Sequence, residues 1–266
     1  MNRKNVLLAS GCSYTDPRFI TPDKNIPESE SGPWPMWPEI LGKRYNMAVI
    51  NKGLSGAANK YIFDSIVDEI HTNENIKKVV VVWSSWDRFK TMAHIEHFPL
   101  AAATDLYHKD FIRNREIYQY EVDYTDFFFS GKYDIGKWVN DAVNSFFRYV
   151  YTLATILESK NISYAFYQGC SAFPIGLLTE IKNPIQYKES DLLFEIASSS
   201  YYNTLRKNRN VIGFPFIKIA GGFNLDHMIG NSEDVRVSEL DTHPNAKGQI
   251  EFANYIEGNC NGLFDK

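Results

Sequence analysis

Short apolar runs that end at small or polar residues recur along the chain. Residues 6–9, 47–50 and 79–83 are continuously apolar, and each run stops at a serine or an asparagine. Apolar runs without alternation are typical of strands that are buried on both faces of a parallel sheet. Residues 162–167 predict a fourth strand, and residues 211–214 predict a weaker fifth one.

The segments between these runs carry apolar residues at helical spacing. In residues 57–70, three isoleucines four residues apart form one stripe. Residues 138–157 repeat this pattern, and residues 245–256 predict a closing helix with Pro244 in its first turn. Because strands that alternate with helices form βαβ units, the sequence predicts an α/β fold with a central parallel sheet.

Two stretches interrupt the alternation. Residues 15–38 are rich in proline and charge and contain Trp34 and Trp37, which predicts a long surface loop. Residues 88–137 are aromatic and charged with weak periodicity, which predicts an insertion rather than a separate domain. A single α/β unit often reaches about 250 residues, so we expect residues 1–266 to form one domain.

Composition and charge narrow the class of protein. With 44% hydrophobic and 23% charged residues the chain is globular, and a net charge of −4 gives no electrostatic basis for nucleic-acid binding. The three cysteines are widely spaced, so they predict neither a disulfide framework nor a zinc site. No run is long enough for a membrane span, and residues 6–9 are too short for a secretory signal. We therefore expect a soluble, cytoplasmic protein.

Three polar turns contain residues that could carry chemistry. Ser13 directly follows the first predicted strand, and ligands of parallel sheets bind beyond the carboxyl ends of the strands. Asp241 and His243 precede the last helix, where the imidazole could take the proton of a serine hydroxyl and the carboxylate could orient the ring. The Gly53–Gly56 turn could offer backbone N–H groups to a developing negative charge. Each turn alone is more often an ordinary loop.

Together, the order of these turns resembles the SGNH, or GDSL-like, hydrolase superfamily. The resemblance lies in Gly-Cys-Ser at 11–13, Asn-Lys-Gly-Leu-Ser-Gly at 51–56 and, most specifically, Asp-Thr-His-Pro-Asn-Ala-Lys-Gly-Gln at 241–249. It implies a three-layer α/β/α domain, flavodoxin-like in its layers. It also implies a serine-dependent esterase that removes acyl groups such as acetyl from lipids, carbohydrates or small molecules, without a cofactor or a metal.

The resemblance also implies roles for individual residues. Ser13 would be the nucleophile, His243 the general base and acid, and Asp241 the group that orients His243. The N–H groups of Ser13 and Gly56 would form an oxyanion hole. From the aromatic residues themselves, and not from the resemblance, we expect Trp34, Trp37 and Trp86 to contact the substrate. Because sugar rings stack on such surfaces, an O-acetylated carbohydrate is one expected substrate.

Three positions depart from the family pattern. Cys12 stands where the family has aspartate, and one residue separates Asp241 from His243 where two are common. Residues 83–88 stand where Gly-x-Asn-Asp is expected, so the asparagine that completes the oxyanion hole has no counterpart. The hydroxyl of Ser85 is the expected replacement.

Several alternatives remain open from the sequence. His94 and His97 would share a helix face, but no third ligand completes a metal site. Asp226-His227 is a rival acid–base pair. The same fold could also serve as a non-catalytic carbohydrate-binding or structural protein, as an acyltransferase using Ser13, or as a nucleotide-binding domain, although a glycine-rich phosphate motif is absent after the first strand.

Overall fold

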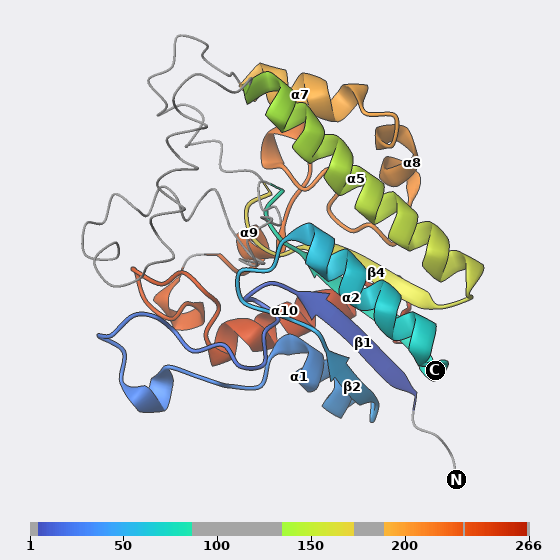
Figure 1. Cartoon of the computed structure of the whole chain (residues 1–266). Coiled ribbons are helices and arrows are strands. Elements are labelled where there is room, and N and C mark those ends of the chain that lie inside the picture. The colour runs from blue at the N-terminus through green and yellow to red at the C-terminus, as the bar shows by residue number, and fades with distance from the viewer. Residues whose placement is uncertain (1–4, 87–134, 173–188, 231, 265–266) are drawn as a thin grey trace, which may run out of the picture.

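The computed structural model describes residues 5–86, 135–172, 189–230 and 232–264. Within these ranges, four parallel strands form one sheet in the order β2-β1-β3-β4 (Figure 1). The strand order reverses direction between β1 and β3, which is where ligands of open parallel sheets bind. The strands are β1 (Val6–Gly11), β2 (Ala48–Asn51), β3 (Ile76–Trp83) and β4 (Ser163–Gln168).

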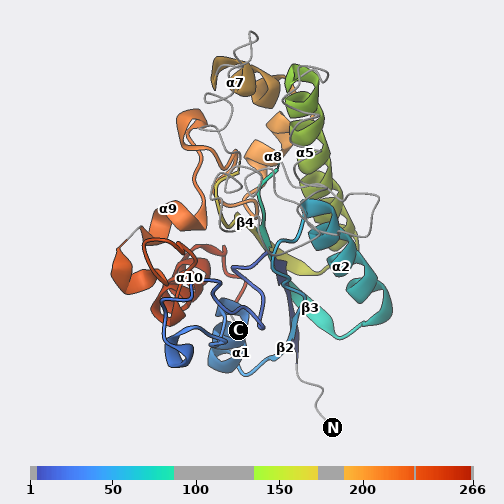
Figure 2. The ribbon, with the colours of Figure 1, turned by 60° about the vertical axis from the view of Figure 1, so that its left-hand side comes forward.

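Helices cover both faces of this sheet (Figure 2). One layer holds α2 (Asn59–Thr72) and α5 (Ile135–Ser159), and the other holds α1 (Trp37–Arg44) and α10 (Ala246–Asn259). The predicted α/β/α sandwich with a central parallel sheet is therefore confirmed. The other α-helices of the described residues are α7 (Glu189–Ser198) and α8 (Tyr202–Lys207), which pack on α5, and α9 (Leu225–Ile229), which packs on α10. Three 3-10 turns span Glu28–Glu30, Lys218–Ala220 and Glu233–Val235.

The apolar runs of the sequence form the centre of the sheet. Residues 79–83 of β3 are fully buried, and β1 is buried along its whole length, as expected for strands covered on both faces. β2 lies at the edge of the sheet and is partly exposed, so the apolar run at 47–50 forms an edge strand and not a central one. On α2, the predicted stripe of Ile62, Ile66 and Ile70 faces the core.

Some elements differ from the sequence prediction. The expected fifth strand is reduced to one β-bridge between Phe166 and Val211. The segment 15–38 ends inside α1, which begins at Trp37. Pro244 lies outside the closing helix, because Asn245 is its N-cap and accepts hydrogen bonds from the N–H groups of Lys247 and Gly248.

Part of the prediction lies outside the described residues. Residues 88–134 of the expected insertion, with His94 and His97, lie outside the described residues. Its last three residues, Ile135–Lys137, form the start of α5. The organisation as one domain stays a prediction. Among the described helices, none combines the length and the apolar character that crossing a membrane requires.

The buried stripe of α2 leads to a stability prediction. Replacing Ile66, which is 0% exposed, with alanine is expected to lower the free energy of unfolding by about 2–5 kcal/mol, because the change leaves a cavity under the sheet. The matched change of Ile250, which is 44% exposed on α10, is expected to cost less than about 1 kcal/mol. Urea denaturation measures both values, and equal losses would contradict this description of the core.

Candidate active site

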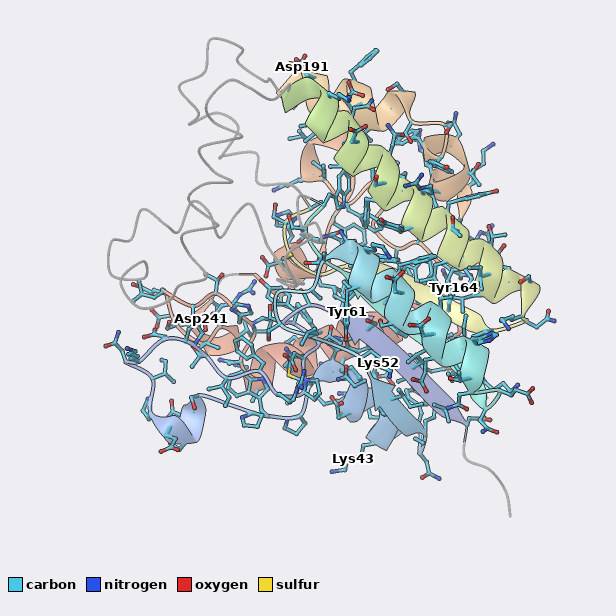
Figure 3. The ribbon with its side chains drawn as sticks, viewed as in Figure 1. Lys43, Lys52, Tyr61, Tyr164, Asp191 and Asp241 are labelled. Atoms are coloured by element: carbon cyan, nitrogen blue, oxygen red, sulfur yellow. The ribbon has the colours of Figure 1, made fainter. Side chains whose placement is uncertain are left out.

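Ser13, His243 and Asp241 meet beyond the carboxyl end of β1. Ser13 Oγ lies 2.8 Å from His243 Nε2, and His243 Nδ1 contacts Asp241 Oδ1. Because a carboxylate only accepts hydrogen bonds, the Nδ1 atom carries the ring proton, and Nε2 is left to accept the proton of the serine hydroxyl. In Figure 3, Asp241 lies among the loops toward which β1 points, whereas Tyr164, near the start of β4, lies on the opposite side.

A tight turn after β1 presents Ser13. The carbonyl of Cys12 accepts hydrogen bonds from the N–H groups of Thr15 and Asp16, so the chain reverses directly around the serine. A Cβ atom at Gly11 would lie 2.2 Å from Thr15 Oγ1, which explains why this position needs glycine. The turn leaves Ser13 only 7% exposed, with its hydroxyl directed at the imidazole.

A second loop, residues 237–243, presents His243. The N–H of Val237 donates to the carbonyl of His243, and the N–H of Ser238 donates to the carbonyl of Asp241. The N–H of His243 donates to Asp241 Oδ1 at 3.1 Å, so the carboxylate contacts both the backbone and the ring of the residue that it orients. The spacing of one residue between Asp241 and His243 therefore permits the pairing.

The segment 15–38 contributes to the site through Thr21. The hydroxyl of Thr21 donates to Asp241 Oδ2, so both carboxylate oxygens are hydrogen-bonded although the residue is only 5% exposed. Burial raises the pKa of Asp241, but the hydrogen bonds and charge of His243 and the Thr21 hydroxyl outweigh burial and hold this pKa below its ordinary value. The carboxylate therefore stays ionised beside the imidazole.

Two aromatic rings hold the imidazole from different sides. The ring of Tyr14 meets His243 edge-on at a centroid distance of 5.2 Å, and the ring of Phe19 lies 4.6 Å away at a shallow angle. Both rings are buried, so they restrict rotation of the imidazole and exclude water from part of its surface. Trp34 follows Phe19 at 6.1 Å.

The Gly53–Gly56 turn lies against the Ser13 turn through Asp16. One carboxylate oxygen of Asp16 accepts hydrogen bonds from both the N–H and the hydroxyl of Ser55, each at 2.8 Å. The N–H groups of Gly53, Leu54 and Ala57 donate to acceptors within the protein. Among the described residues, the N–H groups of Ser13 and Gly56 have no acceptor, as an oxyanion hole requires.

The turn after β3 holds no asparagine, and the structure shows what fixes it instead. The side chain of Asn59, on α2, accepts from the N–H of Ser84 and donates to the carbonyls of Ser84 and Ser85. The hydroxyl of Ser85 donates to the carbonyl of Ala172 at 3.2 Å. Its proton is thus engaged in the protein, which does not fit the expectation that Ser85 replaces the asparagine as a donor.

Two of the three tryptophans expected to contact substrate are core residues. Trp37 is 0% exposed and its indole N–H donates to Thr15 Oγ1, while Trp86 is 4% exposed and stacks on Phe146 at 4.8 Å. Neither offers a free ring face, so the expected substrate contact is wrong for both. Both rings instead fill the sandwich beneath the turns. Trp34 remains partly exposed beside Phe19.

The other candidates have different partners. Asp226 pairs with Arg236 at 2.6 Å, so its carboxylate is committed to a guanidinium rather than to the neighbouring His227 ring as a catalytic pair. Cys12 is fully buried in the core. Among the described residues, no group of three or more histidine, cysteine, aspartate or glutamate side chains could hold a metal ion.

Several residues that shape the site were not predicted. All four are buried, and each bonds to one of the three candidate turns: Asp16, Thr21, Arg236 and Gln249. Gln249 Oε1 accepts from the N–H of Trp37, and its Nε2 donates to the carbonyl of Tyr14. The partners of Asp16, Thr21 and Gln249 lie 39, 220 and 235 positions away, so no local spacing marks these residues. The partners of Arg236 lie within 10 positions, but in an irregular loop that has no periodic pattern. The resemblance at 241–249 does include Gln249, which was the one available signal.

No protein-family model matches the sequence, and no curated protein matches it. Solved structures, however, resemble the chain over nearly its whole length. One is described as a lipolytic protein of the G-D-S-L family from Desulfitobacterium hafniense, with 11% identity, a TM-score of 0.44, and 96% of this chain and 98% of the other covered. Another is the psychrotrophic esterase EstA from Pseudoalteromonas sp., with 12% identity, a TM-score of 0.43, and 98% and 100% covered.

The chain is also similar to the acetyl xylan esterase AlAXEase, at 13% identity and a TM-score of 0.41, with 95% of this chain and 98% of the other covered. A GDSL-family protein and two esterases are thus among the structures that the chain is similar to. Since these TM-scores lie below 0.5, we draw the function from the chain's own geometry.

The hydrogen bonds between Asp16 and Ser55 predict that the stability of the protein depends on pH in the acid range. Burial raises the pKa of Asp16, but the N–H groups of Arg18 and Ser55 and the Ser55 hydroxyl outweigh burial and lower this pKa below its ordinary value. Stability from such a group is present above the unfolded pKa of about 3.9 and is lost as the pH falls through the folded pKa. Asp16→Asn is therefore expected to flatten the loss of stability below about pH 5, measured by urea unfolding at several pH values. An unchanged slope would show that these hydrogen bonds do not contribute.

Proposed function

We propose that the chain is a serine-dependent ester hydrolase, a divergent SGNH-type esterase that works as a single domain. The observation that carries this proposal is the 2.8 Å approach of Ser13 Oγ to an imidazole nitrogen whose other nitrogen is bound to a buried carboxylate. A serine hydroxyl needs such a base to become a nucleophile. The position of this group at the reversal point of the sheet supports the same function.

In the proposed cycle, His243 Nε2 takes the hydroxyl proton as Ser13 Oγ attacks the acyl carbonyl. Asp241 stabilises the imidazolium that forms, because its ionised carboxylate accepts the Nδ1 proton. His243 then gives the proton to the departing alcohol oxygen, which leaves an acyl-serine. Water attacks this ester with the same histidine as base, and the acid and free Ser13 are released.

The N–H groups of Ser13 and Gly56 would stabilise the negative charge on the tetrahedral intermediate. Both groups lack acceptors among the described residues, which supports this role. Without the asparagine that completes the hole in the family, and with the Ser85 hydroxyl bonded to Ala172, the proposed hole has one donor fewer. Loss of one such donor typically costs about 3–4 kcal/mol, or about 10²–10³ in rate. We therefore expect a slow esterase.

The substrate is proposed to be a small acyl ester, with an O-acetylated carbohydrate as one member of the class. The partly exposed ring of Trp34, in series with Phe19 and His243, supports this, since sugar rings stack on such aromatic faces. Trp37 and Trp86 cannot stack on a sugar ring in this way, because both are buried.

Ser13 provides the direct test of the proposed activity. A fluorophosphonate is expected to label the wild-type protein once, at Ser13, and Ser13→Ala is expected to lower turnover of p-nitrophenyl acetate by about 10³-fold or more. Ser198→Ala is the matched control, because Ser198 is exposed on α7 and bonds only within its own helix. Labelling elsewhere, or equal turnover by Ser13→Ala and wild type, would refute the assignment.

Gly56 provides a test of the oxyanion donors. Gly56 has φ +77°, so Gly56→Ala strains the backbone by about 1–2 kcal/mol and displaces its N–H group. We expect kcat to fall at least about tenfold. Gly221 has a similar φ of +80° in a 3-10 turn cap with open space around it, so Gly221→Ala reproduces the strain without touching the site. Equal effects of the two variants on kcat would remove Gly56 from the proposed hole.

A further inference from the structure

Beneath the loop that carries His243 lies the buried guanidinium of Arg236. The side chain is 3% exposed, and the backbone of Arg236 pairs with Pro244 in an antiparallel bridge that closes the base of the loop. All five of its N–H groups donate to acceptors. Nε and Nη2 donate to the carbonyl of Gly230, Nη2 also to that of Asp226, and Nη1 to Asp226 Oδ1 and to the carbonyl of Thr242.

The bond to Thr242 orients the catalytic histidine. Arg236 Nη1 lies 2.8 Å from the carbonyl oxygen of Thr242, which belongs to the same planar peptide group as the N–H of His243. That N–H donates to Asp241 Oδ1 at 3.1 Å. One rigid plane is therefore held at its oxygen by Arg236 and at its nitrogen by Asp241, which fixes the direction in which the His243 side chain leaves the backbone.

Asp226 extends this contact to the other side of the site. Its Oδ1 atom accepts both the Arg236 guanidinium at 2.6 Å and the hydroxyl of Tyr14 at 3.2 Å. Burial, followed by the charge of Asp226, raises the pKa of Tyr14 well above its ordinary value, so the hydroxyl stays protonated and donates. Tyr14 follows the proposed nucleophile directly, and its ring meets the His243 ring edge-on.

We propose that Arg236, ion-paired with Asp226, is a positioning residue that sets His243 against Ser13. Through Asp226 Oδ1 and the guanidinium, the pair links Tyr14, which follows the proposed nucleophile, to Thr242, which precedes the proposed base. Lysine would keep the charge but has only three donors on a flexible stem, so it cannot hold the four groups that the planar fork of Arg236 holds. The catalytic consequence rests on the proposed esterase function, whereas the orientation of the ring does not.

The first experiment measures turnover of p-nitrophenyl acetate by Arg236→Lys, at a temperature below the thermal transition of the variant. A displacement of the base of about 1 Å is expected to lower kcat by about 100-fold in Arg236→Lys, with KM within about twofold of wild type. Arg44→Lys is the matched control, because Arg44 also pairs with a carboxylate, Glu257, but joins α1 to α10 on the surface. Wild-type kcat in Arg236→Lys would overturn the inference.

The second experiment measures the tautomer of the His243 ring directly and does not depend on catalytic turnover. The chain has six histidines, so long-range ¹H–¹⁵N correlation spectra can resolve each ring, with His243 assigned by its loss in His243→Gln. We expect one tautomer, protonated at Nδ1, in the wild type and in Arg44→Lys, and a mixture of tautomers in Arg236→Lys. An unchanged His243 signal in Arg236→Lys would overturn the positioning role. If the wild type neither turns over ester nor reacts with a fluorophosphonate, the esterase proposal fails, and the spectra alone decide the role of Arg236.

Discussion

A carboxylate that is removed from water needs hydrogen-bond donors. In this protein the buried Asp16 and Asp241 and the partly exposed Asp226 accept hydrogen bonds from segments that are distant in sequence. Asp16 joins the turn after β1 to the turn after β2, Asp241 joins the segment 15–38 to the loop before α10, and Asp226 joins Tyr14 to Arg236. The parallel sheet brings the strand ends to one edge, but the strands alone do not fix how the loops beyond them meet. These carboxylates specify that arrangement.

The sheet follows from local sequence patterns, whereas the contacts of the carboxylates do not, and this difference explains what could be predicted from the sequence. The strands and helices follow from apolar periodicity, because residues such as Val80 and Ile66 are buried through local repeats that are visible in the chain. The approach of Ser13 to His243 could be anticipated only from the resemblance to a family, since nothing local relates positions 230 residues apart. The sequence was least informative where an aromatic residue could serve either a core or a surface, as Trp37 and Trp86 show.

Two segments show what composition does not predict. The run at 211–214 has the composition of a strand, yet it pairs with β4 at one bridge only, because the backbone turns away after Val211. The segment 15–38 has the composition of a loop, and most of it is one, yet it supplies Thr21 and Phe19 to the site. Composition reports whether a segment forms regular structure, and it does not report which long-range contacts the segment makes.

The two rings around His243 have a consequence for the path of the proton. A ring held edge-on by Tyr14 and covered by Phe19 has little freedom to turn over between acylation and the departure of the alcohol. If His243 is the base, the nitrogen that receives the serine proton must also be the one that surrenders it. The alcohol oxygen then has to come within reach of the same Nε2 atom while Ser13 Oγ stays bonded to the acyl carbon, which restricts the angle at which an ester can enter.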